Sequence, residues 1–147
     1  MLKGMHPLIG PELLATLARM GHGDLLLVVD RNYPAYASAV PVHRMDGVGA
    51  VAAIEAILTL LPIDDFINAQ MLRMGPVDNP AEITPVQDEA RALVEQVEGR
   101  SIAVEMLERG AFYERARKAA AIVATGEGQP YGCFGLVKGI VRDESGA

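Results

Sequence analysis

One histidine stands in a setting that suits proton transfer. His22 lies between Gly21 and Gly23, and Asp24 follows them. Two glycines let the backbone bend sharply enough to push an imidazole into a cleft, and histidine donates and accepts protons near neutral pH. The alternative is a loop histidine that caps the carbonyls of a preceding helix. Spacing leaves both interpretations open, and His22 is therefore a candidate acid–base residue.

An aspartate follows the apolar run at residues 25–29. Ligands of open α/β sheets gather outside the carboxyl ends of strands. If the run is a buried strand, Asp30 is placed to accept hydrogen bonds from ligand hydroxyls or to orient a histidine. Its alternative role is an Asx turn or a helix cap.

A glycine-rich turn at residues 126–133 contains Tyr131 and Cys133. A phosphate loop needs a helix after its glycines, whereas we expect a strand here, so a turn between strands is the better interpretation. The hydroxyl or ring of Tyr131 would still be available to a ligand. Cys133 is the one cysteine, and in an apolar segment an inert buried thiol is commoner than a nucleophile.

The remaining residue types argue against several kinds of site. The single cysteine excludes an internal disulfide and a cysteine-based zinc site, and the three histidines show no metal-binding spacing. The serines lie in no G-x-S-x-G context. We therefore expect no cofactor and no metal, and a His, Asp and Tyr set that moves protons on a small hydroxylated ligand.

The elements that must position these residues alternate between helix and strand. We expect helices at residues 11–20, 49–61 and 111–118 and a further helix starting at 84–85, where Thr84 and Gln87 fit a capping box. Gly21 should end the first helix with a positive φ. The expected strands are residues 24–30, 40–44 at a sheet edge, 70–74, 101–107, 120–125 and 131–141.

This alternation predicts an α/β protein, a three-layer α/β/α domain around a mostly parallel or mixed sheet. The 147 residues predict a single domain, placed at 1–142, with a flexible tail at 143–147.

The composition of the chain argues against some classes of binding partner and in favour of others. The 13 Lys and Arg against 19 Asp and Glu give a net charge of −6, which disfavours nucleic acid. The longest apolar run, 48–63, is split by Glu55 and is too short for a membrane span. The chain begins with no signal peptide pattern, and one cysteine suits a reducing compartment, so we expect the cytoplasm. The mean hydropathy of +0.21 suggests a homo-oligomer that hides apolar surface.

A series of ordered motifs resembles the fucose mutarotase and ribose pyranase family, and most closely its fucose branch. The motifs are Pro11-Glu12-Leu13-Leu14, Ala18 to Asp24 with Gly-His-Gly-Asp, Asp30 with Asn32-Tyr33-Pro34, Arg44-Met45-Asp46-Gly47, Leu61-Pro62-Ile63-Asp64, Phe112-Tyr113-Glu114-Arg115-Ala116, Thr125-Gly126-Glu127 and Tyr131-Gly132. They span residues 2 to 141.

The resemblance implies a sugar mutarotase that forms a ring-shaped homo-oligomer, typically a decamer. It implies His22 as the proton donor. The residues it implies for sugar binding are Asp30, Asp64, Arg109, Tyr113 and Tyr131, with Cys133 at the position of a family Asn.

Three positions depart from the family pattern: Cys133 replaces the Asn of Y-G-N, Leu25 replaces a Glu, and Arg31 replaces a small residue. A thiol hydrogen-bonds a sugar hydroxyl poorly compared with an amide, which leaves the identity of the sugar open. Two other functions fit the residues. One is a non-catalytic sugar-binding or transport-accessory protein, and the other is a histidine-dependent isomerase of open-chain sugars.

Overall fold

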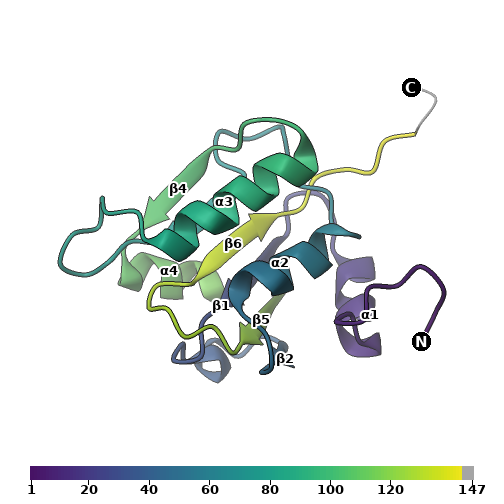
Figure 1. Cartoon of the computed structure of the whole chain (residues 1–147), viewed down its shortest axis with the longest axis horizontal. Helices are drawn as coiled ribbons and strands as arrows, with labels where there is room; N and C mark the ends of the chain where they lie inside the picture. The colour runs from purple at the N-terminus through teal and green to yellow at the C-terminus, as the bar shows by residue number, and fades with distance from the viewer. Residues whose placement is uncertain (144–147) are drawn as a thin grey trace.

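The computed structural model describes residues 1–143, which form one six-stranded sheet. Figure 1 shows the helices arranged around this sheet. The strand order is β2-β5-β1-β6-β3-β4. Five strands run parallel and β6, in the middle, runs antiparallel to both of its neighbours. The strands are β1 (Leu25–Val29), β2 (Val42–Met45), β3 (Met71–Met74), β4 (Val104–Leu107), β5 (Ala121–Thr125) and β6 (Phe134–Val137).

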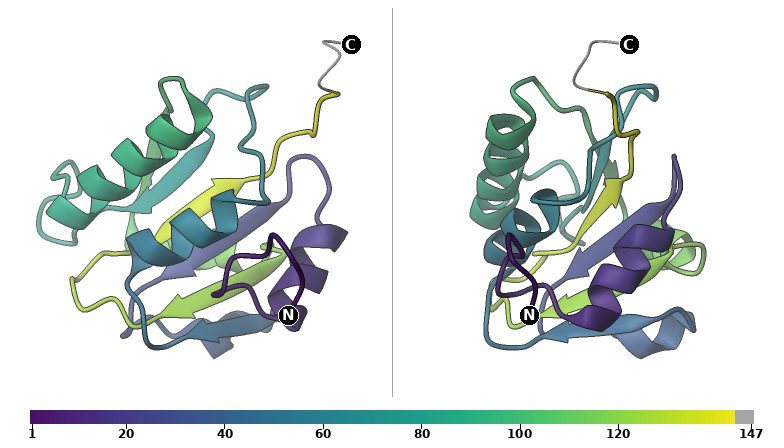
Figure 2. Two further views of the ribbon diagram at one scale, coloured as in Figure 1. Left: turned by 45° about the vertical axis from the view of Figure 1, so that its right-hand side comes forward. Right: turned by 90° about the vertical axis from the view of Figure 1, so that its right-hand side faces the viewer.

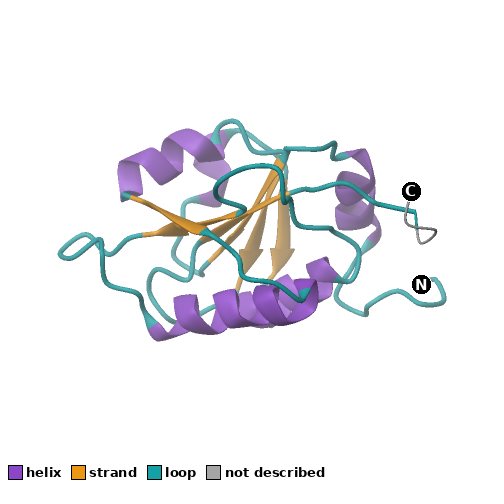
Figure 3. Cartoon of the chain, turned by 90° about the horizontal axis from the view of Figure 1, so that it is seen from above, coloured by secondary structure: helices purple, strands orange, loops and turns teal. Residues whose placement is uncertain are grey.

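The helices cover both faces of this sheet, as Figures 2 and 3 show. The helices α1 (Pro11–Arg19), α2 (Ala50–Leu58) and α3 (Pro85–Glu98) pack on one face, and α4 (Arg109–Ala116) and the 3-10 helix η1 (Ala35–Ser38) lie on the other. Side chains of β1 alternate between the two cores: Leu26 and Val28 face the first, and Leu27 and Val29 face the second. The predicted three-layer α/β/α fold with a mixed sheet is confirmed.

Strand β1 is buried along its whole length, since each of its five residues is buried. It pairs in parallel with β5, where Leu27 lies opposite Ile122, and in antiparallel with β6, where Val28 lies opposite Phe134. Because both of its edges and both of its faces are covered, the continuous apolar run in the sequence predicted this strand well. None of the helices in the described part is long and apolar enough to cross a membrane.

Some local predictions need correction. Gly23, and not Gly21, has the positive φ, at 86°, because α1 ends at Arg19 and the turn toward β1 comes later. The last strand covers only residues 134–137 instead of 131–141, since Tyr131 takes a left-handed backbone with φ of 61°. β2 lies at a sheet edge as expected. Of the tail predicted at 143–147, residues 144–147 lie outside the described residues.

Candidate active site

His22 forms a hydrogen bond to a buried carboxylate. Its Nε2 lies 2.8 Å from Oδ1 of Asp64, and its side chain is 42% exposed while that of Asp64 is 1% exposed. The turn that presents the ring is closed by Asp24, whose Oδ2 accepts from the amide of Gly21 at 2.7 Å. The imidazole therefore has one nitrogen on a fixed partner, while the ring stays partly exposed beside the ring of Phe66.

The backbone around Asp64 is held from several elements. Its amide donates to the carbonyl of Val137 at 2.9 Å, and its carbonyl accepts from Nη2 of Arg100 at 2.8 Å. Gly139 packs so closely that a Cβ there would lie 2.9 Å from Cα of Asp64. The carboxylate that receives His22 is thus fixed by the sheet and by the segment after α3.

The charge on Asp64 determines the tautomer of His22. Burial favours the neutral acid, but the hydrogen bonds from His22 and from the amide of Phe66 outweigh it and hold the pKa of Asp64 below its usual value. An ionised carboxylate only accepts hydrogen bonds, so Nε2 of His22 carries the hydrogen and Nδ1 keeps a lone pair. Oδ2 of Asp64 is buried without a hydrogen-bond partner among residues 1–143.

Asp30 occupies the carboxyl end of β1 and is 8% exposed. Its Oδ1 accepts from the amide of Asn32 at 3.0 Å, and its Oδ2 lies 3.5 Å from Sγ of Cys133. Burial, followed by the charge of Asp30, raises the pKa of the Cys133 thiol well above its ordinary value, so the thiol stays protonated and donates. Cys133 is only 2% exposed and lies behind Asp30, with its thiol directed at that carboxylate.

Three tyrosines lie near this end of the sheet. The ring of Tyr33 packs edge-on against that of Tyr113 at 5.5 Å between centroids. The hydroxyl of Tyr131 accepts from the amide of Val77 at 3.2 Å. Burial, the Cys133 thiol and Tyr113 raise the pKa of Tyr33 far above its ordinary value, so its phenol stays neutral.

Two open pockets adjoin this end of the sheet. One, of about 600 Å³, is lined by residues that include Asp30, Tyr33, Arg44 and Thr125. The other, of about 270 Å³, includes Arg109 with Val77, the residue that contacts Tyr131. Charged side chains of both signs line both pockets, and the larger one is also lined by three hydroxyl-bearing residues, which suits a polar ligand such as a sugar.

The structure divides the predicted site residues into two groups. Asp30 and Cys133 are in contact at the carboxyl end of β1, and Tyr113, Tyr131 and Arg109 are linked to that end through Tyr33 and Val77. His22 and Asp64 lie at the opposite end, since His22 precedes β1 and Asp30 follows it. A strand of five residues is about 16 Å long, so the interpretation that Asp30 orients the imidazole of the same chain is wrong. Asp64 orients it instead.

Two of the three departures from the family pattern have local explanations. Arg31 donates through Nε and Nη2 to the carbonyl of Gly126, at 3.1 and 2.8 Å, and so ties the turn after β1 to the turn after β5. Leu25 is 7% exposed and packs in the core on the α4 face.

Arg73 and Gln87 are among the buried polar residues that the sequence analysis did not assign to the site. They are joined by a hydrogen bond of 3.1 Å, and Gln87 also contacts Tyr131. Arginine in the otherwise apolar strand Met71–Met74 was the available signal, because a buried charge needs partners. Within residues 1–143, no group of three or more His, Cys, Asp or Glu side chains is placed to hold a metal ion.

Comparison with known proteins gives consistent matches. A family model described as the RbsD / FucU transport protein family matches residues 3–141. The chain is 41% identical over 140 residues to the L-fucose mutarotase of Actinobacillus pleuropneumoniae serotype 5b (strain L20), covering 95% of this chain and 97% of that relative. It is 42% identical over 146 residues to the fucose mutarotase of Homo sapiens, covering 95% and 94%. A crystal structure of the fucose mutarotase from Streptococcus pneumoniae with L-fucose superposes with a TM-score of 0.88 at 37% identity, covering 96% of this chain and all of that one.

Proposed function

The chain belongs to the RbsD / FucU transport protein family, and from this premise we propose that it is a mutarotase that interconverts the anomers of L-fucose. The observation that carries most weight is the hydrogen bond between His22 and Asp64, found in a chain that matches fucose mutarotases over almost its whole length. An accessible imidazole on a fixed carboxylate is suited to acid–base chemistry, and mutarotation needs only acid–base chemistry.

Mutarotation breaks the bond between the anomeric carbon and the ring oxygen, and the hydroxyl on that carbon loses its proton to become an aldehyde oxygen. The ring oxygen gains a proton. Both oxygens are bonded to the same carbon, so Nδ1 of His22 can take the proton from one and return it to the other. Asp64 stabilises the imidazolium between these steps. Acid–base help of this kind is worth about 10²–10⁴-fold in rate.

The groups at the carboxyl end of β1 would hold the sugar. The carboxylate of Asp30 would accept hydrogen bonds from sugar hydroxyls, and Arg109, Tyr113 and Tyr131 would supply donors and an aromatic face. Cys133 would act through Asp30, because its thiol donates to that carboxylate. After ring opening the aldehyde rotates about its bond to C2, and closure on the other face gives the second anomer.

His22 with Asp64 and the residues around Asp30 lie too far apart in one chain to contact the same sugar, so a second copy of the chain is needed. We place the working site between subunits of a homo-oligomer, a ring of ten if the resemblance holds, with His22 and Asp64 of one copy facing Asp30 of another. Phe66 and Ile67 support an interface here: they are 63% and 45% exposed, and the ring of Phe66 lies 4.9 Å from that of His22. We place the protein in the cytoplasm, where a lone thiol stays reduced.

The test is NMR exchange between the α and β anomers of L-fucose. Wild-type protein should accelerate exchange, and His22→Ala should remove about 10²-fold or more of that acceleration while the protein stays folded. Unchanged exchange in His22→Ala would remove His22 from the mechanism. Saturable L-fucose binding by the wild type with no faster exchange would indicate a sugar-binding accessory protein, and formation of a new sugar would indicate an isomerase.

A further inference from the structure

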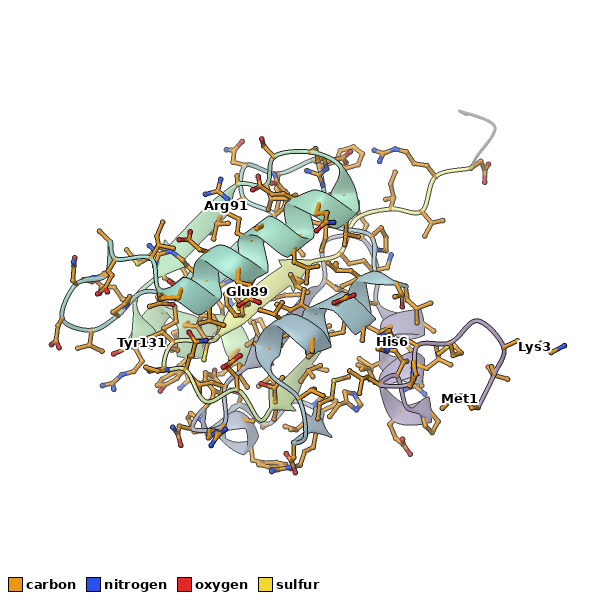
Figure 4. All side chains as sticks on the ribbon, viewed as in Figure 1. Met1, Lys3, His6, Glu89, Arg91 and Tyr131 are labelled. Carbon is orange, nitrogen blue, oxygen red and sulfur yellow. The ribbon has the colours of Figure 1, made fainter. Side chains whose placement is uncertain are left out.

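Tyr131 has a backbone conformation that tyrosine rarely adopts. Its φ is 61°, in the left-handed region, and among the non-glycine residues described only Ala39 shares that sign. Side chains with a Cβ are strained there, so such a conformation persists only when its surroundings hold it. Figure 4 shows Tyr131 near the N-terminal end of α3, which is where its support comes from.

Gln87, on the first turn of α3, supplies that support. It is 2% exposed, and its Nε2 donates to the carbonyl of Tyr131 at 3.0 Å and to that of Met74 at 2.7 Å. Its Oε1 accepts from the amide of Thr84 at 3.2 Å and from Nη1 of Arg73 at 3.1 Å. Both donors and both lone pairs of this side-chain amide are therefore in use, which fixes its orientation.

Arg73 holds the other side of Tyr131 through the loop at residues 75–84. Its guanidinium is buried and donates to the carbonyls of Pro80, Ala81 and Glu82, at 3.2, 3.4 and 2.9 Å. No carboxylate within residues 1–143 forms an ion pair with it. Since a guanidinium stays charged, these carbonyls have to remain in place, and the loop is fixed by them.

The same loop carries Val77, whose amide meets the Tyr131 hydroxyl at 3.2 Å. A backbone amide only donates, so the phenol oxygen accepts there and its own hydrogen points elsewhere. The hydrogen bonds thus form a closed circuit from Arg73 to Gln87, on to Tyr131 and Val77, and through the loop back to Arg73. Within this circuit the hydroxyl is a donor with a fixed position.

We propose that Gln87, oriented by Arg73, is a positioning residue that sets the place of the Tyr131 hydroxyl and thereby the affinity for the sugar. The proposal rests on the function proposed above. Gln87 itself touches no substrate, because it is buried behind the turn that bears Tyr131.

The substitution Gln87→Glu keeps the acceptor oxygen of this side chain and removes its donor group. A carboxylate keeps acceptors for Arg73 and Thr84, but it no longer donates to the carbonyls of Tyr131 and Met74, and circular dichroism checks that the variant is folded. We expect KM for L-fucose to rise about tenfold with a smaller change in kcat, since one hydrogen bond is worth about 1–1.5 kcal/mol. Val94→Ala is the matched control, because it destabilises the same helix from a fully buried apolar position without touching the circuit. It should lower Tm and leave KM unchanged.

A double-mutant cycle tests whether Gln87 acts through Tyr131. In a Tyr131→Phe background, Gln87→Glu should change KM little further, since no hydroxyl is left to misplace. Additive effects on KM, or a wild-type KM in Gln87→Glu, would overturn the proposal.

Fluorotyrosine NMR gives a readout independent of turnover. The resonance of Tyr131 should shift in Gln87→Glu while that of the exposed Tyr36 stays in place, and an unmoved Tyr131 resonance would also overturn the proposal. A wild type that fails to accelerate anomer exchange would count against the proposed function alone, since the NMR shift is measured without it.

Discussion

At the scale of single residues, three of the candidate groups are each hydrogen-bonded to a buried side chain. His22 rests on Asp64, Asp30 on Cys133, and the Tyr131 backbone on Gln87. The three partners are 0%, 2% and 2% exposed. Buried partners of this kind fix tautomers and rotamers, and substitutions at them should alter chemistry more than their distance from solvent suggests.

Asp64→Asn tests the first pair. The amide still accepts from Nε2 of His22 but carries no charge to stabilise the imidazolium, and its flipped form would donate to Nε2 and reverse the tautomer. We expect anomer exchange to slow about tenfold or more, because a charged hydrogen bond is worth about 1.5–3 kcal/mol. Nitrogen-15 shifts of the imidazole report the tautomer.

The control for that substitution is Asp65→Asn. Asp65 is the next residue but is exposed and pairs with Arg142 at the surface. Its loss should leave exchange at the wild-type rate, and equal effects of the two substitutions would contradict a specific role for Asp64.

The pKa of Asp64 also predicts how stability depends on pH. Its folded pKa lies below the ordinary 3.8, so the folded state binds fewer protons than the unfolded state as the pH falls. This contribution is fully present above the unfolded pKa and is lost as the pH falls through the lower, folded value. The free energy of unfolding is measured with urea at about pH 7 and about pH 3.5 for wild type and Asp64→Asn. On going from the higher to the lower pH, wild type should lose stability relative to Asp64→Asn. A difference that is independent of pH would contradict this reading.

Residue types and spacing identified His22 and Asp30 as candidates without any structure, because glycines around a histidine and an aspartate at a strand end are local signals. The partner of His22 is 42 residues away in the chain, and no local pattern names it. The resemblance gave Asp64 as a sugar-binding residue, whereas its burial places it behind the imidazole. Long-range contacts of this kind depend on which strands become neighbours.

At the scale of elements, the apolar runs predicted the strands and the helix signals predicted the helices to within a few residues. Thr84 and Gln87 show how far this goes: the amide of Thr84 does donate to Oε1 of Gln87, as a capping box requires. The further bonds of Gln87, to Tyr131, Met74 and Arg73, are tertiary, and the sequence holds no sign of them. The last strand was overextended because an apolar run does not report a left-handed backbone at its start.

Gly139→Ala tests the element that holds Asp64. A Cβ at position 139 would lie 2.7 Å from the carbonyl oxygen of Ile63 and 2.9 Å from Cα of Asp64, both backbone atoms that cannot move aside cheaply. We expect a loss of about 1–3 kcal/mol in unfolding free energy and slower anomer exchange, measured by urea unfolding and NMR.

Gly47→Ala is the matched control for that change. No atom lies within 4 Å of a Cβ built there, and its φ is not in the left-handed region, so stability should change by less than about 0.5 kcal/mol. Equal losses from the two substitutions would show that the contact at Gly139 is not the cause.

At the scale of the whole molecule, the two groups of the site lie at opposite ends of one buried strand. In the arrangement proposed above, a single copy carries both halves of a site and a neighbouring copy brings them together. In a closed symmetric assembly one contact is repeated around an axis. Each copy then places its His22 end against the Asp30 end of one neighbour and its Asp30 end against the His22 end of another.

Subunit mixing tests this arrangement. His22→Ala and Asp30→Asn should each be nearly inactive, but refolding them together at equal amounts should restore about a quarter of the native sites, since each copy then has an intact half to offer. Anomer exchange by NMR measures the recovery. A mixture no more active than its components would show that both halves work within one chain.

β6 borders both halves, with Cys133 directly before it and the close approach of Gly139 shortly after it. The strand is thus a spacer of fixed length between the acid–base end and the sugar-holding end. Inserting or deleting one residue there would change the separation of the two ends in every copy and reverse the faces of all side chains beyond it. Because all four residues of β6 are buried and a Cβ at Gly135 would lie 3.0 Å from side-chain atoms of Leu25 and Leu72, both the length and the side chains of this strand are constrained.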